Sequence, residues 1–163
     1  MGVNLKDLFV RQQISLEDLS GKVIAIDSFN IIFQFLSTIR GRDGLLLRDS
    51  KGHVTSHLVG LFSRTAHFVQ VGIKPVFVFD GKAPVLKHCE QERRHLVKKE
   101  AEALYQKAEQ KGNVEDMRKF GSRISYVDEE MINDAKKLVS LLGLPVVQAP
   151  SEGEAQAARI PKT

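Results

Sequence analysis

Three short stretches of the chain are almost continuously apolar and rich in β-branched or aromatic residues. They cover residues 22–27, 75–81 and 144–150. Apolar runs of this length, without strict alternation, are typical of strands in a sheet that is covered on both faces. We therefore expect three buried β-strands.

The segments between these runs carry apolar side chains at helical spacing. They cover residues 27–40, 55–71 and 128–142. Thr55 and Asp128 stand at expected N-cap positions, and Gly72 and Gly143 follow the expected last turns. Strands that alternate with helices favour parallel pairing through right-handed crossovers, so the pattern predicts an α/β fold with a parallel, Rossmann-like sheet flanked by helices.

Two further stretches do not fit this alternation. Residues 41–52 predict a small hairpin or excursion. Residues 86–126 are helical in pattern and highly charged, with a break expected at residues 111–113. A helical pair with so few apolar positions either forms a solvated hairpin or projects from the core as an arm, and composition alone favours the hairpin.

The composition is that of a globular chain of one domain. The 163 residues are 42% hydrophobic and 27% charged, which excludes a disordered chain. No apolar run approaches the about 18 residues of a membrane span, and no signal peptide precedes the first strand. Cys89 has no second cysteine to pair with, which favours a reducing, intracellular compartment.

The net charge of +4 is concentrated in one segment. Between residues 82 and 99, two glutamates stand against six cations: Lys82, Lys87, Arg93, Arg94, Lys98 and Lys99. A local basic stripe on a helical segment favours a polyanionic partner.

Four carboxylates follow the ends of the three expected strands. Asp27 and Asp80 end the first two strands, and Glu152 and Glu154 follow the third. Because parallel strands present their carboxyl ends at one edge of a sheet, we expect these side chains to converge there. Oxygen ligands without histidine or cysteine favour Mg²⁺ or Mn²⁺, whose bound water is a nucleophile for a phosphodiester.

Each of these carboxylates also has a purely structural interpretation. Asp27 stands where it would cap the following helix, and Asp80 precedes Gly81 in a turn sequence. Ser151 and Glu154 have the spacing of a capping box. The spacing leaves both interpretations open.

Seven motifs, in order along the chain, resemble the flap endonucleases, and the archaeal form most closely. These enzymes are structure-specific 5′ nucleases of DNA replication and repair. The resemblance extends from residue 1 to about residue 158, and it is carried by residues 1–3, 24–27, 34–40, 55–58, 72–76, 78–82 and 148–155.

The resemblance implies a PIN-like nuclease domain that cuts branched DNA with a 5′ flap by using two divalent metal ions. It implies that residues 84–126 form a helical arch, that the metal ligands are Asp27, Asp80, Glu152 and Glu154, and that Lys87 and Arg94 are the catalytic cations beside the scissile phosphate. The DNA-binding positions that it implies are Gly2, Phe33, Arg40, Arg64, Lys82, Arg93, Lys98 and Lys99.

The chain also departs from the family pattern. Phe33 stands where the family commonly has a tyrosine. Three further metal carboxylates and a C-terminal sliding-clamp peptide have no counterpart, so we expect an N-terminal half with an incomplete sheet and impaired catalysis. Two other functions stay open, namely a non-catalytic DNA-binding fragment and a metal-dependent RNase or phosphatase on a related sheet.

Overall fold

The computed structural model of the chain describes residues 12–81, 88–121 and 127–160. Residues 88–98 and Arg118 are described as parts of helices, without their side chains.

The strands form one parallel sheet in the order β1-β2-β3. β1 (Val23–Asp27) pairs with β2 (Lys74–Phe79), and β2 pairs with β3 (Val146–Gln148). A short 3-10 helix, η1 (Glu17–Leu19), precedes β1. The sheet confirms the three expected strands and their parallel pairing. β1 and β2 are each one residue shorter than the apolar run that predicts them, and β3 is four residues shorter.

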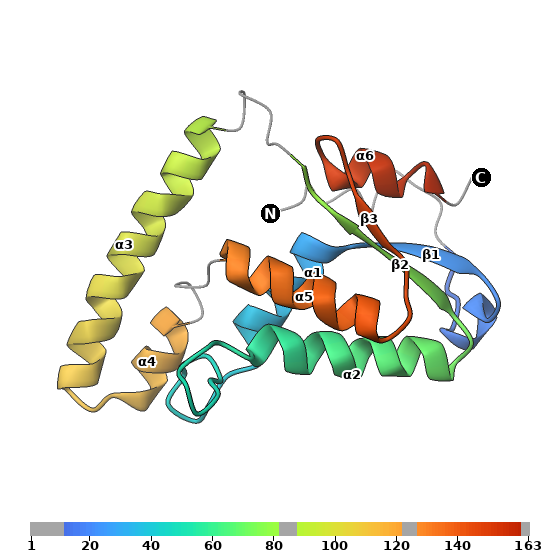
Figure 1. Cartoon of the computed structure of the whole chain (residues 1–163). Helices are drawn as coiled ribbons and strands as arrows, with labels where there is room; N and C mark the ends of the chain where they lie inside the picture. Colours follow the sequence, from blue (N-terminus) through green and yellow to red (C-terminus); the bar gives the residue numbers. More distant parts are fainter. Residues whose placement is uncertain (1–11, 82–87, 122–126, 161–163) are drawn as a thin grey trace.

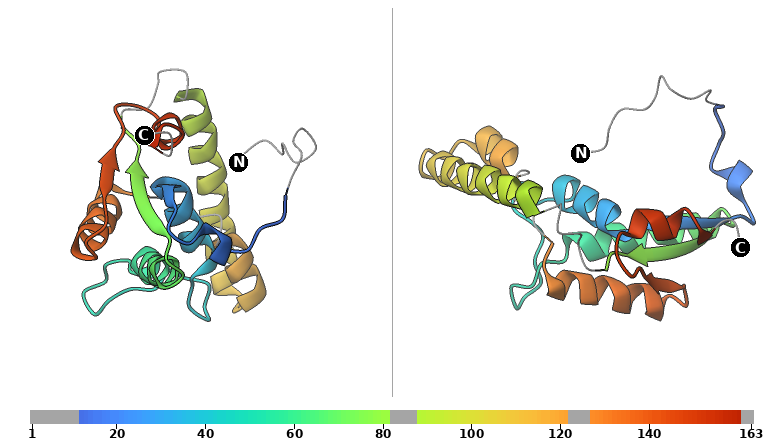
Figure 2. Two further views of the ribbon diagram at one scale, coloured as in Figure 1. Left: turned by 90° about the vertical axis from the view of Figure 1, so that its right-hand side faces the viewer. Right: turned by 90° about the horizontal axis from the view of Figure 1, so that it is seen from above.

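Helices cover the two faces of the sheet unequally (Figures 1 and 2). α1 (Ser28–Thr38), α2 (Ser56–Gln70) and α5 (Glu129–Leu141) lie on one face, and the short helix α6 (Gly153–Ala157) lies on the other. Helices and strands join in one hydrophobic core, whose buried members are Ile32, Phe35, Leu36, Leu61, Phe77, Phe79, Met131, Ala135 and Val139.

β1 is less buried than its apolar sequence predicts. Every residue of this strand is partly or largely accessible, and Val23 is 46% exposed. In the described part of the chain, α6 is the helix on this second face of the sheet. The expectation of a sheet covered on both faces therefore holds for β2 and is wrong for β1.

The helix ends follow the expected signals with one exception. Asp27 and Asp128 accept hydrogen bonds from the backbone N–H groups of Asn30 and Met131, and so cap α1 and α5. Gly72 and Gly143 end α2 and α5 with φ of 82° and 73°, a left-handed conformation that glycine adopts without strain. Thr55 makes no side-chain cap bond, because its backbone is already near-helical.

The charged segment forms an arm of two helices, α3 (His88–Gln110) and α4 (Val114–Gly121), beside the sheet domain (Figure 1). Gly112 lies at the expected break with φ of 64°. Among residues 99–110 of α3, whose side chains are described, the buried ones are Ala101, Tyr105 and Ala108, spaced by four and three residues, whereas the leucine at position 104 is 41% exposed. Both interpretations of the charged segment therefore hold, since its two helices form a hairpin and this hairpin projects from the sheet domain.

Between α1 and α2 the chain makes two tight turns. Isolated antiparallel bridges join Arg40 to Leu46 and Arg48 to Val54. The expected small hairpin is therefore present as two consecutive turns.

His57 on α2 is a fully buried histidine whose ring nitrogens have no hydrogen-bond partner among the described residues. Burial lowers the pKa of His57, and the carboxylates of Asp134 and Asp128 on the α5 side oppose that shift. The neutral imidazole is therefore the form that the folded state accommodates.

The stability of the protein is expected to fall on acidification because of His57. Below about pH 6.5 the unfolded chain binds a proton at this histidine more readily than the folded chain, so the free energy of unfolding falls with pH, by at most about 1.4 kcal/mol per pH unit. Urea unfolding between pH 5 and 7.5 measures this slope. His57→Leu should reduce it, and His67→Gln, at an exposed histidine of the same helix, should not. Equal slopes in His57→Leu and the unsubstituted protein would contradict this origin.

His53 acts in a different pH range. A hydrogen bond to the Asp49 carboxylate raises the pKa of this exposed histidine. Its contribution to stability is present in full below about pH 6.5 and is lost as the pH rises through the pKa of the folded state. His53 therefore does not account for a loss of stability below pH 6.5.

Candidate functional site

The chain segments that follow β2 and β3 are joined by backbone hydrogen bonds. Ala149 N–H donates to the Phe79 carbonyl at 2.8 Å, and Gly81 N–H donates to the Ser151 carbonyl at 2.6 Å. A Cβ atom on Gly81 would collide with the Ala149 carbonyl and lie 2.7 Å from the Pro150 carbonyl carbon. Glycine at position 81 therefore permits the two segments to approach this closely.

Asp80 lies against the first residues of α6. Its Oδ1 accepts a hydrogen bond from Gly153 N–H at 2.6 Å, across 73 residues of sequence. Glu152 is the N-cap residue of α6 and makes no side-chain cap bond, so Asp80 caps this helix in its place. Glu154 lies in the first turn. The backbone thus places one aspartate and two glutamates at the same point of the sheet edge.

Asp27 belongs to the same edge of the sheet. It is the last residue of β1 and lies opposite Val78 of β2. Asp80 follows Val78 by two residues, just past the end of β2. Its Oδ1 accepts from Asn30 N–H at 3.1 Å. The capping interpretation of Asp27 is confirmed, and a carboxylate has a second oxygen that can accept or ligate in addition.

The donor chemistry of this edge fits a hydrated Mg²⁺ or Mn²⁺ ion. Carboxylate oxygens are the ligands that these ions prefer, and Mg²⁺ keeps several waters while it binds through one or two carboxylates. Among the described residues, no group of three or more histidine, cysteine, aspartate or glutamate side chains is placed so that it could hold a metal ion. The described side chains of the four predicted carboxylates therefore do not form one ligand set, and their role in metal binding stays a prediction.

The sequence does not indicate that two further residues, Gln148 and Lys136, contact each other at this edge. The side chain of Gln148, at the end of β3, donates to the carbonyl groups that follow β2, and the ammonium of Lys136 on α5 donates to Gln148. A glutamine and a lysine 12 residues apart carry no local signal for this contact. The contact of Gln148 with the end of β2 follows from the parallel register, in which Phe79 is level with Gln148.

The candidate DNA-binding residues are unevenly described. Phe33 on α1 is 39% exposed, and Arg64 on α2 and Lys99 on α3 are exposed. Gly2, Lys82 and Lys87 lie outside the described residues. Arg93, Arg94 and Lys98 lie on α3, and their side chains are likewise not described. The roles expected for all of these residues stay predictions.

Arg40 lies at the joint between the arm and the core. Its guanidinium donates to the Gly44 carbonyl at 2.9 Å, and burial lowers the pKa of Arg40. A Cβ on Gly121, at the end of α4, would lie 2.8 Å from the Gly44 carbonyl oxygen and 3.5 Å from the Tyr105 ring. The Arg40 side chain thus supports the turn on which the arm rests, and its predicted contact with DNA stays open.

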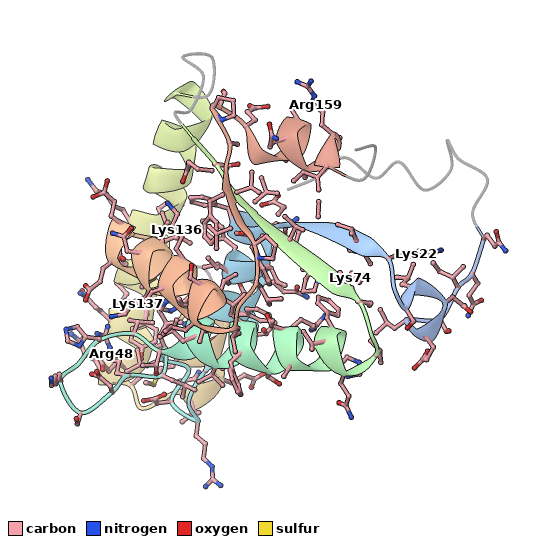
Figure 3. All side chains as sticks on the ribbon, turned by 45° about the vertical axis from the view of Figure 1, so that its right-hand side comes forward. Lys22, Arg48, Lys74, Lys136, Lys137 and Arg159 are labelled. Carbon is pink, nitrogen blue, oxygen red and sulfur yellow. The ribbon has the colours of Figure 1, made fainter. Side chains whose placement is uncertain are left out.

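Other cations of the described chain are spread over the molecule (Figure 3). Lys22 and Lys74 lie at the amino ends of β1 and β2, Lys136 and Lys137 lie on α5, and Arg48 lies in the turns before α2. Such a scatter does not by itself form a binding surface. The basic segment at residues 82–99 remains the concentrated feature.

Fold and site together define an α/β domain with carboxylates at the carboxyl edge of a parallel sheet and a charged helical arm between β2 and β3. The chain belongs to the XPG N-terminal domain family, whose profile matches residues 1–101. This membership and the fold agree with the resemblance seen in the sequence.

Curated relatives extend the match over the whole chain. Proteins named flap endonuclease 1 from Pyrococcus horikoshii and Nitrosopumilus maritimus are 56% and 52% identical over 97% and 100% of this chain. The matches cover 46% and 48% of those proteins. The chain thus spans about half the length of the curated relatives that it matches.

Solved structures agree with the sequence matches. A flap endonuclease-1 from Methanococcus jannaschii superposes with a TM-score of 0.69 at 43% identity, over 99% of this chain and 51% of that chain. The catalytic core of Rad2 in complex with DNA substrate superposes with a TM-score of 0.56 at 30% identity, over 93% and 38%. None of the described helices of this chain has the length and apolar character needed to cross a membrane.

Proposed function

We propose that this chain is the N-terminal half of a flap endonuclease, a metal-dependent phosphodiesterase that cuts branched DNA near the base of a 5′ flap. The observation that carries the proposal is the contact of Asp80 with the start of α6, the short helix whose N-cap and first turn hold Glu152 and Glu154. The identity above 50% to flap endonucleases across the whole chain supports it.

The four carboxylates of Asp27, Asp80, Glu152 and Glu154 would hold Mg²⁺, with Mn²⁺ as a substitute. When bound, the ion supplies a water of lowered pKa and stabilises negative charge at the phosphate. The chain itself orients the site, because Gly153 N–H fixes one oxygen of Asp80 and the Asn30 N–H fixes one oxygen of Asp27.

The arm would contact the phosphate backbone of the DNA. Lys87 and Arg94 are assigned to the scissile phosphate, and the neighbouring cations Lys82, Arg93, Lys98 and Lys99 to the single-stranded flap. Gly2, Phe33, Arg40 and Arg64 are assigned to the DNA near the site. Contacts of this kind release counterions, so binding is expected to weaken steeply as salt concentration rises. Binding to a sliding clamp is assigned to the complete protein only.

A non-catalytic DNA-binding role is the second candidate. It is favoured by the absence of a three-ligand group among the described residues. In this case the arm would bind DNA without hydrolysis.

Incubation with labelled substrates distinguishes the two functions. The chain is mixed with a 5′-flap duplex, an RNA of the same sequence or a small phosphoester, in Mg²⁺ or after removal of divalent ions with EDTA. Cutting of the flap duplex near the junction, dependent on Mg²⁺, is the expected result. Intact DNA that is bound in a salt-dependent manner would support the second candidate, and preferential turnover of RNA or the phosphoester would overturn both.

A further inference from the structure

Three elements meet at the side chain of Gln148. Its Nε2 donates to the carbonyl of Asp80 at 2.6 Å and to that of Phe79 at 3.3 Å. Its Oε1 accepts from the Lys136 ammonium at 2.7 Å. The contacts therefore connect α5 and β3 with the end of β2, and Asp80 connects that end with α6 through Gly153.

Lys136 determines which way the Gln148 amide faces. An ammonium group only donates, so it requires the amide oxygen, and the amide nitrogen is then directed to the two carbonyls. The Lys136 ammonium also lies 5.3 Å from the centre of the buried Phe79 ring, within the range of a cation–π contact. Two contacts thus hold the half-buried Lys136 side chain over the end of β2.

The Asp80 carbonyl is held by a side chain and not by the backbone of the neighbouring segment. The Phe79 carbonyl accepts Ala149 N–H, and the N–H of the Asp80–Gly81 peptide donates to the Ser151 carbonyl, whereas the carbonyl of that peptide accepts from Gln148. Gln148 holds this carbonyl while Gly153 N–H holds the side chain of the same residue. Loss of the Gln148 contact would allow the Asp80 carboxylate to rotate away from the sheet edge.

We propose that Lys136 and Gln148 are positioning residues that fix the Asp80 carboxylate for divalent metal binding. The inference rests on the proposed function, since it concerns the same edge. Partners that orient a ligand from behind typically change metal affinity by about 10- to 100-fold when they are removed.

The sign of the effect separates positioning from simple electrostatics. Lys136→Gln removes a positive charge near the site, and electrostatics alone would then raise the affinity for a cation. Positioning predicts the opposite, a loss of Mn²⁺ affinity of about 10-fold. Lys137→Gln, at the exposed neighbour on α5, makes the same change of charge without the contact to Gln148.

The experiment measures Mn²⁺ affinity by electron paramagnetic resonance for the full chain and its variants. Lys136→Gln and Gln148→Leu should each lose about 10-fold, Lys136→Arg should restore most of the affinity, and Lys137→Gln should not lose any. Hydrogen exchange of the Gly153 amide, measured without metal, should be faster in Lys136→Gln and Gln148→Leu. Thermal melting confirms that each variant is folded. Lys136→Gln and Gln148→Leu each remove one partner of the same hydrogen bond, so their losses of Mn²⁺ affinity should agree.

Three results would overturn the inference. If folded Lys136→Gln and Gln148→Leu bind Mn²⁺ with wild-type affinity while Asp80→Asn does not bind it, the positioning role of Lys136 and Gln148 is refuted and the proposed metal site is not. Equal losses in Lys136→Gln and Lys137→Gln refute the contact with Gln148 as the cause. A wild-type chain that binds no Mn²⁺ refutes the proposed metal site and this inference together.

Discussion

Asp80→Asn is expected to lower the affinity for Mn²⁺ or Mg²⁺ by at least about 100-fold and to abolish cutting of 5′-flap DNA. Asparagine has the shape of aspartate, and its Oδ1 still accepts the hydrogen bond from Gly153 N–H. The substitution therefore preserves the cap of α6 and removes only the negative charge that a cation requires. Calorimetric titration and a cleavage gel are the measurements.

The same substitution tests the structural interpretation of Asp80. If this residue only capped α6, Asp80→Asn would bind metal like the unsubstituted chain, and Asp80→Ala alone would show an effect, on stability. Glu129→Gln is the matched control, because it removes one negative charge from an exposed position of α5. Unchanged metal binding in Asp80→Asn would contradict the proposed metal site.

Gly60→Val is expected to lower the free energy of unfolding by about 3 kcal/mol. Gly60 lies on α2 where this helix crosses α1, and a Cβ there would collide with the Phe35 ring and lie 2.7 Å from Ile39 Cδ1. Phe35 is 5% exposed and belongs to the buried core, so its ring cannot turn away into solvent. The two helices must therefore separate, which opens the core.

Thermal and urea unfolding measure this loss, and a fall in melting temperature of about 10 °C is expected for a chain of this size. Ser63→Val, at an exposed position of the same helix, controls for the effect of valine on helix formation. If both variants melted at the same temperature, the close approach of α1 and α2 at Gly60 would be wrong.

The elements of the core could be predicted from the sequence because their signals are local. The predicted helix at residues 55–71 differs from α2 (Ser56–Gln70) by one residue at each end. Gly143 ends α5 as its position predicts. The partial exposure of β1 could not be predicted, because the apolar sequence of a strand does not indicate whether a helix covers its second face.

The sequence predicts which edge of the sheet carries the candidate residues, and it does not predict the hydrogen bonds that these residues make. The rule that parallel strands end together places Asp27 and Asp80 correctly, since β1 and β2 are in parallel register. The capping box of Ser151 and Glu154 is wrong, since Glu152 is the N-cap residue and the side chain that caps α6 comes from Asp80. A contact across 73 residues of sequence leaves no periodic signal in either segment.

The packing of the arm was also missed. In the part of α3 whose side chains are described, Ala101 and Ala108, with Tyr105 between them, are the buried residues, and none of them belongs to the strongly apolar residues by which a helical face is usually recognised. Their spacing by four and three residues is the usable signal. It places two small side chains and one aromatic ring on the same face of the helix.

The long separations between the paired segments also determine when the acidic edge forms during synthesis of the chain. Ribosomes release the N-terminal residues first, so β1, β2 and the arm all emerge before the residues that complete the edge. Gln148 reaches the Asp80 carbonyl across 68 residues, and Gly153 reaches its carboxylate across 73. Non-local pairings of this kind form slowly, since the intervening chain must be ordered first. A nascent chain therefore carries its basic segment at residues 82–99 well before it gains the edge that would bind metal.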